Sequence, residues 1–153
     1  MAAHSTCIEP PGLIFQFAER HSFAIRVMAF QRRISIAVPN DFDTLSSIYR
    51  AFNARDIEKV LSVMHPEVEW PNGWEGGYVF GREGVRDYWT RQWKAIDPHV
   101  EPVSLETDAS GSIVVKVHAL IRDLEGNIVS DGHVVHVYQF EDGLIRRMEI
   151  RPF

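Results

Sequence analysis

Several features that mark whole classes of protein are missing or scarce in this sequence of 153 residues. Its single cysteine, Cys7, excludes an intrachain disulfide and a cysteine-based metal cluster. No run of about 18 apolar residues occurs, so no membrane span is predicted. The formal net charge of -5 disfavours nucleic acid, because its binders need a basic stripe to displace counterions from phosphates. We expect a cytoplasmic protein with neither nucleic acid nor membrane as a partner.

Motifs for metal, phosphate and nucleophile chemistry are also missing. The glycines between residues 73 and 84 lack the lysine and the strand–turn–helix context of a phosphate-binding loop. His133 and His136 are three residues apart, which on a regular strand points them to opposite faces and argues against a shared metal. No serine or cysteine lies in a nucleophile elbow. We therefore expect no cofactor and no metal.

Residues 1–40 differ from the rest of the chain. The first twelve are small, polar and proline-containing, and we expect part of this extension to be disordered. The stretch that follows mixes apolar residues with four arginines and only one acid, Glu19. Three interpretations stay open for it: a loosely packed extension, a start codon assigned too early, and a mitochondrial transit peptide. The domain proper is predicted at residues 41–153.

Hydrophobic periodicity and turn signals divide this domain into helices followed by strands. Helices are predicted from about Asp41 to Phe52, over 57–64 and over 83–95, with Asp56 as the N-cap of the second. A short strand at 68–70 separates the second helix from the third. Four more strands are expected at 100–107, 113–124, 128–140 and 144–150, joined by tight turns. Helices and strands that are segregated in this way indicate an α+β fold.

Three segments carry a resemblance to a known family: YRAFNARD at 49–56, HPEVEW at 65–70 and HVVHVYQFEDGLI at 133–145. In this order and spacing they resemble the SnoaL-like branch of the nuclear transport factor two-like superfamily, which includes ketosteroid isomerases and polyketide cyclases. The resemblance implies a cone-shaped α+β fold, in which a curved antiparallel sheet wraps around three N-terminal helices and leaves an internal pocket. It also implies a homodimer formed through the outer face of the sheet.

The resemblance to ketosteroid isomerases allows a test of three positions. Those enzymes use a tyrosine on the first helix, an aspartate base after the first strand, and a protonated acid on a long strand. Ile48, Asn72 and His136 stand at the corresponding positions of this sequence. Isoleucine has no hydrogen-bond donor and asparagine does not accept a proton near neutral pH. Conventional ketosteroid isomerase chemistry is therefore not expected.

His136 and Asn72 are nevertheless the candidate catalytic residues. A pocket-facing histidine can act as general acid or base, because its unperturbed pKa lies near neutrality. The alternative is a half-buried histidine held by one hydrogen bond. Asn72 can orient a carbonyl or a water, or it is present because asparagine favours the turn it occupies. Strand alternation, aromatic content and the resemblance predict the pocket lining as Ile48, Phe52, Trp70, Trp74, Tyr78, Trp89, Val117, Ala119, Val134, Tyr138 and Met148.

Charged residues of the last strands are expected on the opposite face of the sheet. Asp131 and His133 look like a dyad, but both alternate with His136 and should face outward. Epoxide hydrolases of the same superfamily use an Asp–Arg–Asp arrangement in the pocket, of which Asp131, Arg147 and Glu149 are a faint counterpart. A β-bulge would be needed to turn these side chains inward.

Three functions stay open from the sequence. The first is an enzyme that catalyses isomerisation, cyclisation or another proton transfer on a small hydrophobic molecule. The second is a module that binds such a ligand without chemistry. The third is an interaction or dimerisation domain whose pocket is filled by its own aromatic side chains.

Overall fold

The computed structural model describes residues 39–153, so most of the expected N-terminal extension lies outside the described part of the chain. Three helices and six strands make up the described region. In chain order they are α2 (Pro39–Asn53), α3 (Ile57–Leu61), β1 (Met64–Pro71), β2 (Tyr78–Phe80), α4 (Gly81–Gln92), β3 (Ile96–Thr107), β4 (Ile113–Asp123), β5 (Ile128–Glu141) and β6 (Leu144–Pro152). The expected α+β class is confirmed.

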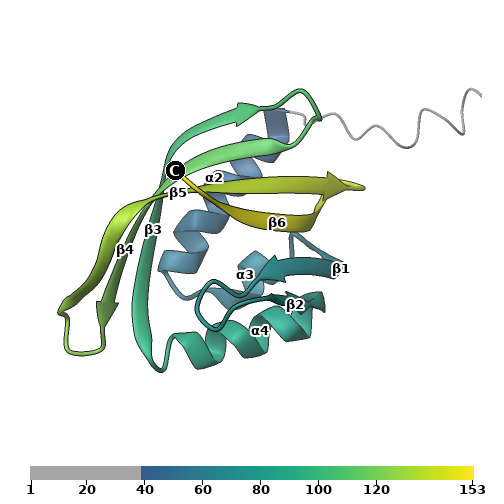
Figure 1. The fold of residues 1–153 in the computed structure, drawn as a ribbon. Coiled ribbons are helices and arrows are strands. Elements are labelled where there is room, and N and C mark those ends of the chain that lie inside the picture. Colours follow the sequence, from purple (N-terminus) through teal and green to yellow (C-terminus); the bar gives the residue numbers. More distant parts are fainter. Residues whose placement is uncertain (1–38) are drawn as a thin grey trace, which may run out of the picture. The chain divides into compact units, whose positions relative to one another are not determined.

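The six strands form one open, curved sheet in the order β2-β1-β6-β5-β4-β3. Strands β3 to β6 pair with their chain neighbours as an antiparallel meander, as expected from their short turns. The pairing of β1 with β6 is parallel, so the sheet is antiparallel only in part. Figure 1 shows the long strands β3, β4 and β5 curving around α2, with α4 beside β1 and β2. This half-open cone leaves a concave face against the helices.

The helix boundaries follow from local chemistry, and each of the three helices differs from expectation at one end or both. Helix α2 begins at Pro39 rather than near Asp41, which instead places its carboxylate in the first turn; proline suits a first turn because the missing N–H has no partner there. Asp56 caps α3 as expected, accepting a hydrogen bond from the Lys59 backbone N–H at 3.2 Å. Helix α3 ends at Leu61, however, and Met64 opens β1. Helix α4 occupies 81–92 rather than 83–95.

Two strand assignments also change. Residues 78–80, expected in a loop, form the short edge strand β2 against the end of β1. Strand β3 begins at Ile96 and includes Pro98 and Pro102. A strand tolerates proline where no neighbour needs its N–H, and β3 lies at the edge of the sheet.

The hairpin between β4 and β5 sets which side chains face the helices. A tight turn is expected here, and a two-residue turn at Gly126-Asn127 would pair Val117 with His136. Instead Asp123 and Asn127 close a three-residue loop, and Gly126 takes a φ of 93°, as three-residue hairpins require. The pairing of Val117 with Val134 and of Val115 with His136 shifts by two residues from the expected register. A shift of two keeps every side chain on its expected face, because the strand period is two.

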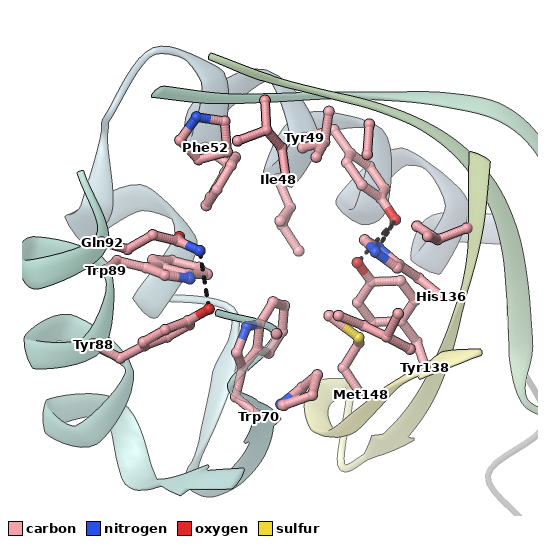
Figure 2. Close-up of a pocket in the computed structure, with 18 residues that line it drawn as sticks. Ile48, Tyr49, Phe52, Trp70, Tyr88, Trp89, Gln92, His136, Tyr138 and Met148 are labelled. Atoms are coloured by element: carbon pink, nitrogen blue, oxygen red, sulfur yellow. Dashed lines mark hydrogen bonds between the residues drawn. The ribbon is translucent and has the colours of Figure 1, made fainter. Parts of the chain in front are cut away.

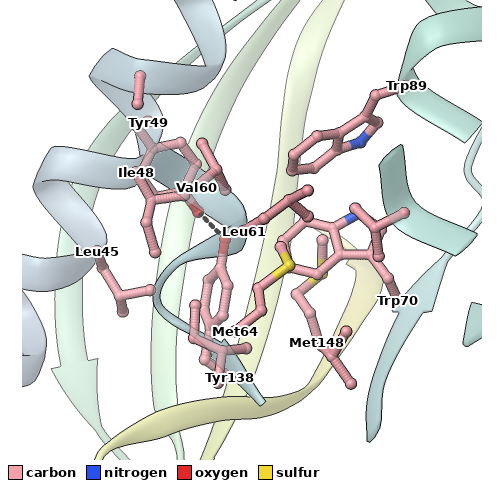
Figure 3. Close-up of a cluster of buried hydrophobic side chains, with 14 of the residues drawn as sticks. Leu45, Ile48, Tyr49, Val60, Leu61, Met64, Trp70, Trp89, Tyr138 and Met148 are labelled. Atoms are coloured by element: carbon pink, nitrogen blue, oxygen red, sulfur yellow. Dashed lines mark hydrogen bonds between the residues drawn. The ribbon is translucent and has the colours of Figure 1, made fainter. Parts of the chain in front are cut away.

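The core lies between the concave face of the sheet and the helices. Leu45 of α2, Val60 of α3 and Met64 of β1 are fully buried there. Figure 3 shows them packed with Tyr138 and Met148 of the last two strands. Burial of apolar area on this scale is the main force that holds helices to the sheet. Among the described helices, none has the length and apolar character needed to cross a membrane.

Candidate functional site

A cavity of about 330 Å³ opens between the concave face of the sheet and helices α2 and α4. This size falls at the lower end of the range typical for small-molecule sites. Figure 2 shows side chains from both helices and from the sheet directed into it. The lining residues are Ile48, Tyr49, Phe52, Trp70, Pro71, Gly73, Tyr88, Trp89, Gln92, Pro98, Val100, Ala119, Ile121, Val134, His136, Tyr138, Met148 and Ile150.

One end of the cavity is polar and holds a chain of three rings. The Tyr138 hydroxyl donates to the Tyr49 hydroxyl oxygen at 2.9 Å. The Tyr49 hydroxyl in turn lies 2.9 Å from Nδ1 of His136. All three side chains are less than a tenth exposed. Figure 2 shows this chain on one side of the cavity, with the imidazole at its end.

The direction of the hydrogen bond from Tyr138 to Tyr49 favours one tautomer of His136 over the other. Because Tyr49 receives the hydrogen of Tyr138, its own hydrogen is free to be donated to Nδ1 of His136. A neutral imidazole that accepts at Nδ1 carries its hydrogen on Nε2. No hydrogen-bond partner for Nε2 exists among the described residues, yet this atom is not among the buried polar atoms sealed from solvent. In this tautomer Nε2–H is an unpaired donor on a side chain that lines the cavity.

Burial determines the charge state of this chain. Removal from water lowers the pKa of His136 to about 4, so the imidazole is neutral at physiological pH. Burial raises the pKa of Tyr49 well above its ordinary value, and the neighbouring Tyr138 adds to the effect. Burial likewise raises the pKa of Tyr138. The polar end of the cavity is thus uncharged and presents one hydrogen-bond donor.

The opposite side of the cavity is formed by α4. Gln92 Nε2 donates to the Tyr88 hydroxyl at 3.0 Å, four residues earlier on the same helix face. Between the two polar ends stand aromatic rings: Trp89 meets Phe52 at 5.1 Å and Trp70 at 5.4 Å, both edge to face. Edge-to-face packing is a favourable arrangement for such rings. The wall between the two polar ends is consequently apolar.

The structure brings most of the expected site residues together. Those that line the cavity are Ile48, Phe52, Trp70, Trp89, Ala119, Val134, His136, Tyr138 and Met148. They come from six different strands and helices, so only the folded chain makes them neighbours.

Four expected residues lie elsewhere. Asn72 turns its amide into its own loop, accepting from the Glu75 N–H at 2.7 Å and donating to the Glu75 carboxylate at 2.8 Å. Trp74 is 42% exposed and lies outside the cavity lining. Tyr78 lies against the Arg147 guanidinium at 5.1 Å on the sheet edge. Val117 faces the helices but is fully covered by core side chains, so the cavity does not reach it.

Three functional side chains were not identified from the sequence. Tyr49 belongs to the apolar stripe of α2, where a tyrosine is interpreted as a core residue. Tyr88 and Gln92 share the stripe of α4 with Trp89. A glutamine on an otherwise apolar stripe was the available signal, because an amide is rarely placed toward a core without a partner.

The charged residues of the outer face stay outside the cavity. Asp131 pairs with His118 at 2.6 Å, and the His133 ring lies beside His118. Arg147 pairs with Glu69 at 2.6 Å and with Glu149 at 3.2 Å. None of these charged side chains lines the cavity, so the Asp–Arg–Asp arrangement of epoxide hydrolases is not formed there.

Comparisons with known proteins agree with this architecture. The SnoaL-like domain family matches residues 45–148. The crystal structure of TerC, co-crystallised with polyporic acid, superposes with a TM-score of 0.64 at 27% identity over 73% of this chain and 90% of its own. A protein of unknown function from Burkholderia pseudomallei, described as NTF2-like, gives a TM-score of 0.66 at 24% identity over 76% and 92%.

A further structure shares the fold and contains a ligand. The Mycobacterium tuberculosis protein in complex with estradiol-17β-hemisuccinate has a TM-score of 0.62 at 21% identity, covering 71% of this chain and 90% of its own. The search of curated proteins finds no match. Since the family match spans more than half of the chain, this protein belongs to the SnoaL-like domain family.

Proposed function

We propose that this protein binds a small hydrophobic molecule that carries a carbonyl group, and that His136 donates a hydrogen bond to that carbonyl. The observation that carries the proposal is the unpaired Nε2–H of a neutral, buried imidazole that lines an apolar cavity. A donor in such surroundings favours an acceptor oxygen, because an unpaired polar group away from water is costly. An open cavity also argues against a pocket filled by its own side chains.

Proteins of similar fold support a ligand of this kind. TerC holds polyporic acid, and the Mycobacterium tuberculosis protein holds a steroid ester. Both ligands combine an apolar ring framework with oxygen-bearing groups. The aromatic middle of the present cavity, with Trp70 and Trp89, suits the same kind of framework.

As an activity we propose a proton-transfer reaction, such as isomerisation or cyclisation, in which negative charge develops on the carbonyl oxygen. The Nε2–H of His136 would stabilise that charge as a fixed donor in a water-poor site. If His136 gave up this proton completely, it would take a proton from Tyr49, and Tyr49 would take one from Tyr138. Buried Tyr138 would then be a tyrosinate, which the raised pKa of that residue opposes. His136 therefore acts as a hydrogen-bonding electrophile, and a basic atom of the substrate itself would accept the proton lost from carbon and return it at the new position.

A second function, binding without chemistry, is favoured by one observation. No aspartate, glutamate or lysine lines the cavity, so the described residues provide no strong base beside the ligand. A protein that only carries or senses an apolar ligand needs no such base. Pairing of two copies through the outer face of the sheet, as implied by the family, stays a prediction for either function.

The test is native mass spectrometry of the protein purified from its own host, followed by denaturing extraction of any bound molecule. We expect a neutral, carbonyl-bearing ligand, whose retention falls at least tenfold in His136→Phe, because the donor is lost. His118→Phe is the matched control, since His118 lies on the outer face. Equal retention by both variants would contradict the role of His136. Incubating the recovered ligand with fresh protein and finding it unchanged would favour binding without chemistry.

A further inference from the structure

The side of the cavity opposite His136 contains a second polar group that the proposed function does not use. Tyr88 and Gln92 are one helical turn apart on α4, and both line the cavity. Figure 2 shows them across the cavity from the His136 chain. Tyr88 is only 3% exposed, so its hydroxyl is not a surface feature. Solubility therefore does not explain why two polar side chains lie in this place.

The hydrogen-bonding capacity of the pair exceeds what the protein itself uses. Gln92 donates one of its two amide hydrogens to the Tyr88 oxygen, which also accepts from the backbone N–H groups of Gly73 and Trp74. Burial raises the pKa of Tyr88, so the phenol keeps its hydrogen at neutral pH. No acceptor for that hydrogen, and no partner for the Gln92 carbonyl oxygen, is found within residues 39–153. The pair can therefore both donate to a ligand and accept from it.

The rest of the cavity limits the charge of such a ligand. Its eighteen lining residues include no aspartate, glutamate, lysine or arginine. A carboxylate or an ammonium group placed among them would lose its hydration without gaining an opposite charge, which costs several kcal/mol in a protein interior. Uncharged carbonyl and hydroxyl groups meet no such penalty when they are hydrogen-bonded.

We propose that Tyr88 and Gln92 form a second polar subsite, so that the ligand is an uncharged molecule with an apolar ring body and a polar group at each end. The end at His136 must be an acceptor, because Nε2–H only donates there. The end at Tyr88 and Gln92 is a carbonyl or a hydroxyl, since this pair both donates and accepts. The proposal rests on the proposed function, which supplies the first of the two contacts.

Two rigid ketone series test the subsite at two spacings. The first is naphthalene, 2-acetylnaphthalene and 2,6-diacetylnaphthalene; the second is biphenyl, 4-acetylbiphenyl and 4,4′-diacetylbiphenyl. Equilibrium dialysis against the full chain gives a dissociation constant for each. In at least one series the diketone should bind roughly three- to tenfold more tightly than the monoketone, the gain expected from one further hydrogen bond between neutral groups. The corresponding ketone acids, 6-acetyl-2-naphthoate and 4′-acetylbiphenyl-4-carboxylate, should bind at least about tenfold more weakly than the diketones.

Variants connect the gain to the subsite. Gln92→Met keeps the length of the side chain but removes the amide, and Tyr88→Phe removes the hydroxyl. Each should lower the advantage of the diketone to less than about twofold, while the monoketone, held by His136, keeps its affinity. Unchanged monoketone affinity also shows that the cavity is intact in the variant. Gln139→Met is the matched control, because Gln139 is exposed on β5 and outside the cavity.

The outcomes separate this proposal from the one on which it rests. A monoketone that binds through His136, with no gain for either diketone, would overturn the second subsite alone. A gain that survives both Gln92→Met and Tyr88→Phe would do the same. Ketone acids that bind as tightly as the diketones would overturn the uncharged ligand class. If no neutral ketone binds at all, the proposed carbonyl-binding function fails together with the subsite.

Discussion

Replacing Tyr49 by phenylalanine removes the middle hydroxyl of the buried hydrogen-bonded chain. This change should lower the free energy of unfolding more than removing the hydroxyl of the neighbouring Tyr138 does. Two contacts are lost together: the one from Tyr138 at 2.9 Å and the one to His136 Nδ1 at 2.9 Å. Each leaves a buried polar atom without a partner, at a cost of about 1–3 kcal/mol. We therefore expect Tyr49→Phe to lower the free energy of unfolding by about 3 kcal/mol.

Tyr138→Phe should be milder, although Tyr138 is the more deeply buried of the two tyrosines. It removes only the terminal donor, and the Tyr49 hydroxyl still donates to His136. The expected loss is about 1 kcal/mol. The double variant, Tyr49→Phe with Tyr138→Phe, leaves only the histidine nitrogen unpaired. It should be more stable than Tyr49→Phe alone by about 1 kcal/mol, since the orphaned phenol is gone.

Urea unfolding of the four proteins, followed by circular dichroism at pH 7, measures this cycle. For a domain of this size, 1 kcal/mol also corresponds to a change in Tm of about 2–4 °C, which calorimetry resolves. Additive losses, or a double variant less stable than Tyr49→Phe, would refute the reasoning. Either result would mean that the three rings are not linked by the two hydrogen bonds.

Four further predictions concern the site and its surroundings. Burial lowers the pKa of His136 to about 4, whereas an unfolded histidine titrates near 6.5. The unfolded chain therefore takes up the proton first, and the stability difference between the natural protein and His136→Gln should fall by at most about 3 kcal/mol between pH 6.5 and pH 4. It should be constant above that window in urea titrations, and a difference that rises on acidification would contradict the assignment. Asn72→Ala should cost about 1 kcal/mol through loss of its contacts to Glu75 but should change ketone affinity less than about threefold, in contrast to His136→Phe. Trp74→Ala, at an exposed position, should leave stability within about 0.5 kcal/mol in the same assay. Ala119→Leu adds apolar volume to the cavity wall and should weaken ketone binding at least about fivefold without loss of Tm; unchanged affinity would place the ligand elsewhere.

The fold could be anticipated because its signals are local. Alternation along 128–140 placed Val134, His136 and Tyr138 on one face, and the observed register kept them there despite a longer turn. Asp56 before an apolar helix predicted the cap that the structure shows. The parallel pairing of β1 with β6 had no such signal, because it joins segments that are far apart in the chain.

The site could be anticipated only in part. His136 was singled out from its strand position, but its partner Tyr49 lies 87 residues earlier on a helix. In the sequence, Tyr49 is one of several residues of an apolar stripe. The position that corresponds to the ketosteroid isomerase tyrosine is occupied by Ile48 instead. Asn72 was chosen because it follows the first strand, yet the turn uses its amide within the loop. An asparagine that can satisfy its hydrogen bonds locally does so at little entropic cost.

By itself, the sequence determined the class of fold, the order of the helices and of the long strands, and the apolar character of the concave face. These depend on residue periodicity and turn chemistry, which act over a few residues. The family followed from the resemblance of three motifs in their order and spacing. Only the tertiary structure decided that His136 is a neutral donor, that two tyrosines hold its tautomer, and that Tyr88 and Gln92 face it across the cavity. Hydrogen bonds of this kind form between side chains whose distance is set by the packing of α2 and α4 against the sheet. Burial, which controls the pKa of His136, is likewise a property of the whole fold.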